Sequence, residues 1–358
     1  MKAKLIGLIV VCGVIGAAIG YKTSSDRNLS TVLKGYVGGE KIGFLEDEDV
    51  GNILRKKYHL TLDYSKAGSL DMVTADKEGK DFLWPSSQTA LELYKQEVGK
   101  PVRSDTIFNT PIVIYTRKAV SDALKKEGVV SVSAGASGSA DVYTVDLEKL
   151  VGLVEDGTSW SSVGLPQLYG NVTVSSTDPT KSNSGNMFAG LLANTLAGGV
   201  ATESNIDEYL PEIESIFEKS GYMESSSADI FSEFLKMGMG AKPLVVGYEN
   251  QLLEFASQQP SKWDKVKDDV VMLYPVPTVW SSHVLIALDD QASGAVDALQ
   301  DEEIQDLAWK KHGFRTDVSG GSADLSAYDG IGIEETVTQV GQMPNYKTMK
   351  KIIDYLGQ

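Results

Sequence analysis

Short runs of β-branched residues that end in small polar residues recur along this chain, and a helical pattern follows each of them. Residues 31–38, "TVLKGYVG", end in glycine, and the spacing of apolar residues predicts a helix over 46–58. Residues 80–96 repeat this order, with a strand, a Pro-Ser-Ser turn and a helix that starts at a hydroxyl residue. Residues 110–116, "TPIVIYT", form the next strand-like run. Repeated strand–loop–helix units predict an α/β fold built on mainly parallel sheets with flanking helices.

The length of the chain bears on the number of domains. At 358 residues it is too long for one ordinary hydrophobic core and suits two domains of typical size. A long β-type passage over 269–288 is interrupted by Pro275 and Pro277. Because proline cannot donate a ladder hydrogen bond, this passage suits a crossing between domains better than the middle of a sheet.

The N-terminus has the pattern of an export signal. Lys2 and Lys4 precede residues 5–21, which carry no charge, and this matches a basic region followed by an apolar region. Residues 1–21 are therefore expected to be a signal peptide, cleaved before Tyr21, or an uncleaved membrane anchor. Lipidation at Cys12 is disfavoured, and a buried first strand or helix is the remaining alternative. We expect the protein outside the cytoplasm, either secreted or tethered to the outer face of the cell membrane.

Composition and motifs exclude several classes of function. The net charge of −16 disfavours nucleic acid as a partner, because no basic block is available to displace counterions from phosphates. One cysteine and three scattered histidines provide no metal-ligand spacing, and we expect structural or surface roles for the histidines. The Gly-x-Ser-x-Gly, His-Glu-x-x-His, Walker and Gly-x-Gly-x-x-Gly motifs are all missing. We therefore expect no catalytic activity, no metal and no cofactor.

Polar loops at the ends of the expected strands are the best candidates for a binding site. In open α/β sheets, ligands bind beyond the carboxyl ends of strands, where helix N-termini present unpaired N–H groups. Serine at a helix start is also the favoured N-cap without any ligand, so each loop has a purely structural alternative. Together the loops favour a shared cleft. The four junctions are Gly39-Glu40-Lys41, Gly68-Ser69, Ser86-Ser87-Gln88 and Ser182-Asn183-Ser184-Gly185.

Several segments resemble a known family. The loop "STDPTKSNSG", the strand end "VGYENQ", the passage "MLYPVPTVWSSHVLIAL" and the C-terminal "LAWKKHGF" are similar to type II periplasmic or extracellular solute-binding proteins of ABC transporters. "GGEKIGFLEDEDV", "AGSLDM" and "DFLWPSSQTA" resemble a Gram-positive subgroup of these proteins. The resemblance spans about residues 30 to 350. It implies two α/β lobes that close on a solute over a two-strand hinge, with lobe one at 30–110 and 280–358 and lobe two at 111–279.

The resemblance also assigns roles to residues. Loops from both lobes would contact the solute, with Tyr248 and Glu249 at the back of the cleft. Hydroxyls and free N–H groups favour an oxyanion or carboxylate, whereas Glu40, Asp178 and Glu249 would repel an anion unless Lys41 or Lys181 pairs with them. We therefore expect a small polar solute that is anionic or zwitterionic. The complete expected set of ligand-binding residues is Glu40, Lys41, Ser69, Ser86, Ser87, Gln88, Thr177, Ser182, Ser184, Gly185, Tyr248 and Glu249.

The resulting hypothesis is an extracytoplasmic binding protein, expected as a monomer, that delivers a small-molecule solute to an ABC transporter permease in the membrane. One alternative is a membrane-anchored interaction or sensor ectodomain with the same fold. The other is an extracytoplasmic hydrolase.

Overall fold

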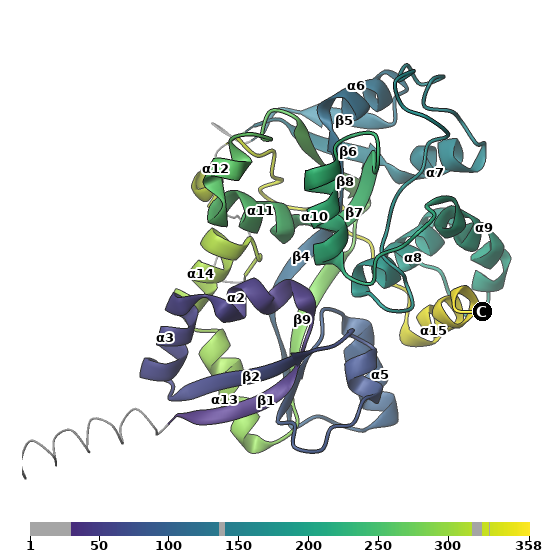
Figure 1. Ribbon diagram of the computed structural model, residues 1–358. Coiled ribbons are helices and arrows are strands. Elements are labelled where there is room, and N and C mark those ends of the chain that lie inside the picture. The colour runs from purple at the N-terminus through teal and green to yellow at the C-terminus, as the bar shows by residue number, and fades with distance from the viewer. Residues whose placement is uncertain (1–29, 136–139, 317–323, 329) are drawn as a thin grey trace, which may run out of the picture.

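One strand, β4 (Arg103–Arg117), belongs to both halves of the molecule. The computed structural model describes residues 30–135, 140–316, 324–328 and 330–358. β4 pairs over Arg103–Pro111 with β9 (Trp280–Ala287) and over Ile112–Arg117 with β7 (Leu244–Tyr248) and β8 (Val270–Val276). β8 leads through Pro277 into β9, so the chain crosses between the halves twice in adjacent strands (Figure 1). The long β passage at 269–288 is this second crossing.

The first half, at the bottom of Figure 1, contains the predicted parallel strands. β1 (Thr31–Val37) runs parallel to β2 (Leu60–Lys66) and to β3 (Phe82–Trp84), and β3 pairs antiparallel with β9. Its helices are α2 (Ile42–Glu46), α3 (Glu48–Lys57), α4 (Asp71–Thr74), α5 (Gln88–Glu97), α13 (Asp290–Leu299) and α14 (Glu302–His312), with a 3-10 turn, η1 (Gly39–Lys41), after β1.

The helix predicted over 46–58 is confirmed as α3. Asp47 is its N-cap, since the carboxylate accepts hydrogen bonds from the backbone N–H groups of Asp49 and Val50. Val50 and Leu54 lie on its buried face. The sequence pattern did not separate the short helix α2, which ends just before Asp47 and buries Phe44 in the core of the first half.

The second half, at the top of Figure 1, contains β5 (Val130–Ser133), β6 (Val142–Asp146), β7 and β8. β6 runs parallel to β8, and β5 runs antiparallel to β6. Its helices are α6 (Lys118–Lys126), α7 (Leu147–Glu155), α8 (Asn183–Leu196), α9 (Ile206–Lys219), α10 (Ser227–Met237), α11 (Glu249–Gln258) and α12 (Pro260–Trp263).

Two C-terminal elements complete the fold. After the 3-10 turn η3 (Leu325–Ala327), α15 (Tyr346–Leu356) packs against α8 and α9 of the second half and α5 of the first half. Helix α14 contacts α2 and α3 as well as α11, so it also touches both halves. Hydrophobic side chains of α15, including Met349 and Ile352, join the core around α8.

The predicted two-lobe α/β fold is confirmed, with a mixed sheet in the order β2-β1-β3-β9-β4-β8-β6-β5 and β7 beside β4. The parallel pairs of β1 with β2 and with β3 occur where the sequence predicts strand–loop–helix units, and β6 with β8 is a third parallel pair. Antiparallel pairs involve β3, β4, β5, β7, β8 or β9, because strands that cross between halves or return after a hairpin run against their neighbours. The proposed lobe boundaries and the use of the crossing strands as a hinge stay predictions.

The expected export signal at 1–21 lies outside the described residues. Within the described ranges, no helix has both the length and the apolar character needed to cross a membrane.

Candidate functional site

A polar cavity of about 420 Å³ lies where loops of the two halves meet. Its first-half wall comes from the carboxyl ends of the parallel strands β1 and β2, which reach the same edge of the sheet. Its second-half wall comes from the residues that begin α8 and α10. The lining residues are Gly38, Gly39, Glu40, Lys66, Ala67, Gly68, Ser69, Asp71, Lys181, Ser182, Asn183, Ser225, Ser226 and Ser227.

The start of α8 is shaped by close packing of its preceding loop. The hydroxyl of Ser184 lies 2.7 Å from that of Thr177 and 3.1 Å from that of Ser182. A Cβ atom at Gly185 would lie 2.2 Å from the carbonyl oxygen of Thr177, so only glycine permits this approach. Ser182 occupies the N-cap position, but its side chain makes no capping hydrogen bond, and no acid follows in the first turn. The positive end of the α8 dipole therefore faces the polar cavity without a built-in counter-charge.

Helix α10 begins similarly, except that it carries an acid, Asp229, in its first turn. Its N-cap is Ser226, again without a side-chain capping hydrogen bond. Ser227 follows, is only 7% exposed and lines the same cavity. Two helix starts from the second half therefore open on one cavity.

Hydrogen bonds between the halves surround the polar cavity. The Asn183 side-chain amide donates to the carbonyl of Ser86 and to the hydroxyl of Tyr248, both at 3.0 Å. Across the cavity, the Lys66 ammonium donates to the Ser226 hydroxyl at 3.2 Å. Ser86 and Lys66 belong to the first half, while Asn183 and Ser226 belong to the second. The described conformation is thus one in which the two halves are in direct polar contact.

A buried ion pair forms the back of the first-half wall. The Lys41 ammonium, which is fully buried, lies 2.6 Å from both Glu40 Oε1 and Ser86 Oγ and 3.1 Å from His283 Nδ1. Burial raises the pKa of Glu40, but the charges of Lys41 and His283 and the hydrogen bonds from Lys41 and Ser86 outweigh it and lower that pKa to about 2. Burial lowers the pKa of Lys41, an effect that Glu40 opposes. Burial and the Lys41 charge hold the pKa of His283 well below its ordinary value.

This cluster answers the question of repulsion raised by the sequence. Glu40 is paired with Lys41, and Asp178 is paired with Lys181 at 2.9 Å. Neither carboxylate presents an uncompensated negative charge to the cavity. Glu249 is also compensated, since both of its oxygens contact the Arg315 guanidinium, at 2.6 and 2.7 Å.

The structure places the expected ligand-binding residues in three settings. Glu40, Ser69 and Ser182 line the polar cavity. Behind these, buried against one another or against the cavity wall, are Lys41, Ser86, Thr177, Ser184, Gly185 and Tyr248. The others make separate contacts: Ser87 caps α5, Gln88 is exposed and donates to Thr106, and Glu249 is held by Arg315 and Tyr274.

Several residues that line the polar cavity are not in the expected ligand-binding set, and Lys66, Asn183, Ser226 and Ser227 are those whose contacts or positions are described above. Asn183 stood inside a recognised junction, but no signal indicated that its amide reaches the other half. Lys66 ends β2, and its role depends on a partner 160 residues away. Ser226 and Ser227 had the strongest available signal, since a run of serines precedes an amphipathic helix, the same pattern that marked α5 and α8.

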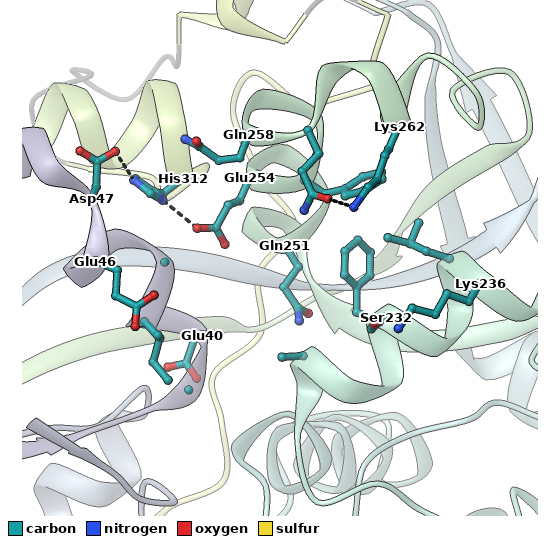
Figure 2. Close-up of a pocket in the computed structure, with 18 of the residues that line it drawn as sticks. Glu40, Glu46, Asp47, Ser232, Lys236, Gln251, Glu254, Gln258, Lys262 and His312 are labelled. Carbon is teal, nitrogen blue, oxygen red and sulfur yellow. Dashed lines mark hydrogen bonds and ion pairs between the residues drawn. The ribbon is translucent and has the colours of Figure 1, made fainter.

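A second, larger cavity of about 840 Å³ adjoins the first and shares Gly39, Glu40 and Lys66 with it. Figure 2 shows this space between α2 on one side and α10, α11 and α12 on the other. We call it the groove. Among the described residues, no group of three or more His, Cys, Asp or Glu side chains is arranged to hold a metal ion.

Two halves, two crossing strands and a polar cavity at their junction define the type II periplasmic binding protein fold, and solved structures of such proteins are similar to this chain. AfuA from Actinobacillus pleuropneumoniae, solved with exogenous fructose-6-phosphate bound, superposes with a TM-score of 0.59 at 13% identity over 91% of this chain and 97% of AfuA. A periplasmic thiamin binding protein gives a TM-score of 0.58 at 12% identity, with coverage of 92% and 95%. The Trichodesmium protein IdiA (FutA), in complex with iron and citrate, gives 0.55 at 12% identity, with coverage of 91% and 98%.

At these identities the likeness shows the fold alone. No family model and no curated protein sequence matches the chain. The narrower resemblance to a Gram-positive subgroup stays a prediction. Any statement about the solute therefore has to come from the residues of this chain.

Proposed function

We propose that the protein is an extracytoplasmic solute-binding protein that captures a small anionic or zwitterionic solute between its halves and delivers it to an ABC transporter permease. The observation that carries the proposal is the polar cavity, which is lined from both halves and entered by two helix starts. The proteins of similar fold are binding proteins whose solutes include a sugar phosphate, thiamin and iron with citrate. Such variety means that the fold supports binding but does not select the solute.

The charges in the polar cavity favour an anionic group on the solute. Lys66 forms no ion pair within the described residues, although it lines the cavity, so its charge is available. The N-termini of α8 and α10 add oriented N–H groups, and α8 also adds the positive end of its dipole, whereas Asp229 in the first turn of α10 offsets part of that helix's dipole. A carboxylate or phosphate beside Lys66 would interact with the Lys66 ammonium and with the N–H groups at the starts of α8 and α10.

The same cavity also has room for a cationic group. Asp71 lines it from the first turn of α4 and is exposed there, while Glu40 is compensated by Lys41. An ammonium group on the solute would lie near Asp71 while an anionic group faces Lys66. Because Lys66 and Asp71 carry opposite charges at separate places in the cavity, we propose a zwitterion as well as a simple anion as the solute.

Binding would act on the contact between halves. The bonds from Asn183 to Ser86 and from Lys66 to Ser226 join the halves in the closed arrangement, and opening must break them. A solute that contacts both walls stabilises the closed form by its differential affinity for the two forms. The permease would then distinguish closed from open protein by shape.

The test is a binding survey by thermal shift and isothermal titration calorimetry with organic anions, zwitterions, cations and neutral sugars. We expect an anion or zwitterion to raise the midpoint temperature of unfolding. At a ligand concentration one hundred times Kd, the free energy of unfolding should rise by about 2.7 kcal/mol. Lys66→Ala should weaken that binding at least tenfold. Binding restricted to neutral or cationic solutes, or no binding by any class, would contradict the proposal.

A further inference from the structure

The groove is a second compartment of the same interhalf space. It has about twice the volume of the polar cavity, and both are lined by Gly39, Glu40 and Lys66. A free oxyanion or a simple amino acid held in the polar cavity would leave the groove unused. Pockets that enclose organic ligands usually have volumes of about 300–1,000 Å³, so the groove alone is large enough to hold a substantial part of a solute.

One wall of the groove is apolar. Phe231 and Leu235 come from α10 and Phe255 from α11, and Val266 lies just beyond α12. The rings of Phe231 and Phe255 meet edge to face, with centroids 6.2 Å apart, so the apolar side chains of this wall are in contact, although Phe231 is only 8% exposed. Phe255 and Leu235 are only partly buried in the core behind them, so part of each remains available to a solute.

The other wall and the rim are charged. Figure 2 shows Glu40 and Glu46 on the α2 side, with Lys236 and Lys262 on the side of α10 and α12. The groove therefore has an apolar surface between charged edges rather than an apolar surface throughout. Charged edges of both signs keep the mouth hydrated, while the ring surface below can take an apolar group out of water.

A polar bridge fixes the width of the groove. His312 Nδ1 lies 2.7 Å from Glu254 of α11, and His312 Nε2 lies 3.3 Å from Asp47, the N-cap of α3 (Figure 2). The Glu254 carboxylate also lies so close to Gly43 that a Cβ there would be 2.0 Å from its oxygen. These contacts hold α2 and α11 at a set separation, so the groove is a built part of the closed form.

We propose that the solute is an organic anion or zwitterion with an apolar, ring-sized extension, whose charged head occupies the polar cavity and whose extension lies in the groove against Phe231, Leu235 and Phe255. This inference rests on the proposed function, because it takes the polar cavity as the site of the charged head. Burial of a phenyl-sized group against these side chains should raise affinity on the order of ten- to a hundredfold over the compact analogue.

The experiment compares matched pairs of compounds by calorimetry on the full chain. The pairs are phosphate and phenyl phosphate, sulfate and phenyl sulfate, acetate and 3-phenylpropionate, and glycine and phenylalanine. Ser232→Trp places a large side chain in the groove from a half-buried position on α10. Met237→Trp is the matched control, because Met237 lies on the same helix, is 59% exposed and is not part of the groove lining. Leu235→Ala is a second groove variant that removes wall surface without filling the space.

The expected result is tighter binding of the extended member of a pair, with the gain lost in Ser232→Trp, reduced in Leu235→Ala and retained in Met237→Trp. The compact member should bind all four proteins alike. Equal affinity for both members, or a gain that survives Ser232→Trp, would overturn the inference and leave the proposed function in place. Loss of compact and extended binding together in both groove variants would also overturn it, since the groove would then not be a separate compartment. Binding of no compound in any pair would overturn this inference and the proposed function together.

Discussion

The buried pair of Lys41 and Glu40 gives the sharpest test of the structure. Lys41→Met removes the ammonium and replaces it with an unbranched apolar side chain of similar length. Glu40 then keeps one hydrogen bond from Ser86 but loses its cation in an environment where both side chains are almost completely buried. Removing one partner of a buried ion pair costs about 3–5 kcal/mol, because the remaining charge is left without compensation.

The pKa of Glu40 provides a second route to the magnitude. The gap between its pKa of about 2 and its ordinary 4.5 corresponds to about 3 kcal/mol of stabilisation. Because the folded-state pKa lies below the unfolded value, this stabilisation is complete above pH 4.5 and is lost as the pH falls toward 2. The lowered pKa of Lys41 acts in the opposite direction, so about 3 kcal/mol is an upper bound for the pair.

The variant should have the reverse pH dependence. Without Lys41, which provides the largest opposing effect, burial of Glu40 is opposed only by His283 and the Ser86 hydrogen bond, and we expect its pKa to rise above the unfolded value. The folded protein then takes up a proton more readily than the unfolded chain, so the deficit relative to wild type shrinks as the pH falls from 7 toward 4.5. Adding Glu40→Gln to the variant should restore most of the loss at pH 7, because no buried charge remains.

The assay is urea unfolding followed by tryptophan fluorescence at pH 7, 5.5, 4.5 and 3.5. Lys310→Met is the control, since Lys310 and its partner Asp306 are both about half exposed. Loss of this exposed ion pair should change the stability little. Lys41→Met within 1 kcal/mol of wild type at pH 7 would refute the reasoning. A wild-type pH profile retained in the variant would refute it as well.

Three further predictions concern the cavity wall and the contact between halves. Ser87→Ala should lower the free energy of unfolding by about 1 kcal/mol, because the Ser87 hydroxyl caps α5. Ser182→Ala should cost less stability but weaken solute binding, because Ser182 makes no capping hydrogen bond. Unfolding and titration of both variants test this, and equal losses of stability would contradict it. Gly185→Ala should destabilise the protein by about 1–3 kcal/mol, since its Cβ would lie 2.2 Å from a backbone carbonyl oxygen. Gly152→Ala is the control and should be neutral or stabilising in the same unfolding assay, because a Cβ there meets no atom within 4 Å. A neutral Gly185→Ala would argue against the close packing at the start of α8. Asn183→Ala removes the hydrogen bond from Asn183 to Ser86 between the halves, so the solute-free protein should show a larger radius of gyration by small-angle X-ray scattering. An unchanged radius would mean that this bond does not hold the halves together.

Local patterns were sufficient to predict the strand–loop–helix units. Apolar spacing identified α3, and a Pro-Ser-Ser turn identified the start of α5 at a hydroxyl residue. These features depend on residues within one turn of each other, so the sequence contains the whole signal. Strand direction does not share this property, because β3 and β9 pair antiparallel through residues about 200 positions apart.

The site could be predicted only where residues close together in the sequence indicate a loop before a helix. A run of serines before a helix marks an N-cap, but only the folded structure distinguishes Ser87, which caps its helix, from Ser182, which does not. The position of Glu249 depends on Arg315, and the role of Lys66 depends on Ser226. Such pairings between distant residues follow from the topology of the sheet rather than from any nearby residue.

The pairing of β3 with β9 has a consequence for how the chain is assembled. During synthesis, β1, β2 and β3 emerge early, but the strand that completes their sheet is made only after the entire second half. Until residues 280–287 arrive, the outer edge of β3 has no partner, and bringing it together with β9 requires closure of a very long loop. Contacts of this range slow folding. The N-terminal strands should therefore remain unfolded, and able to pass in extended form through a narrow channel, until the last quarter of the chain is available.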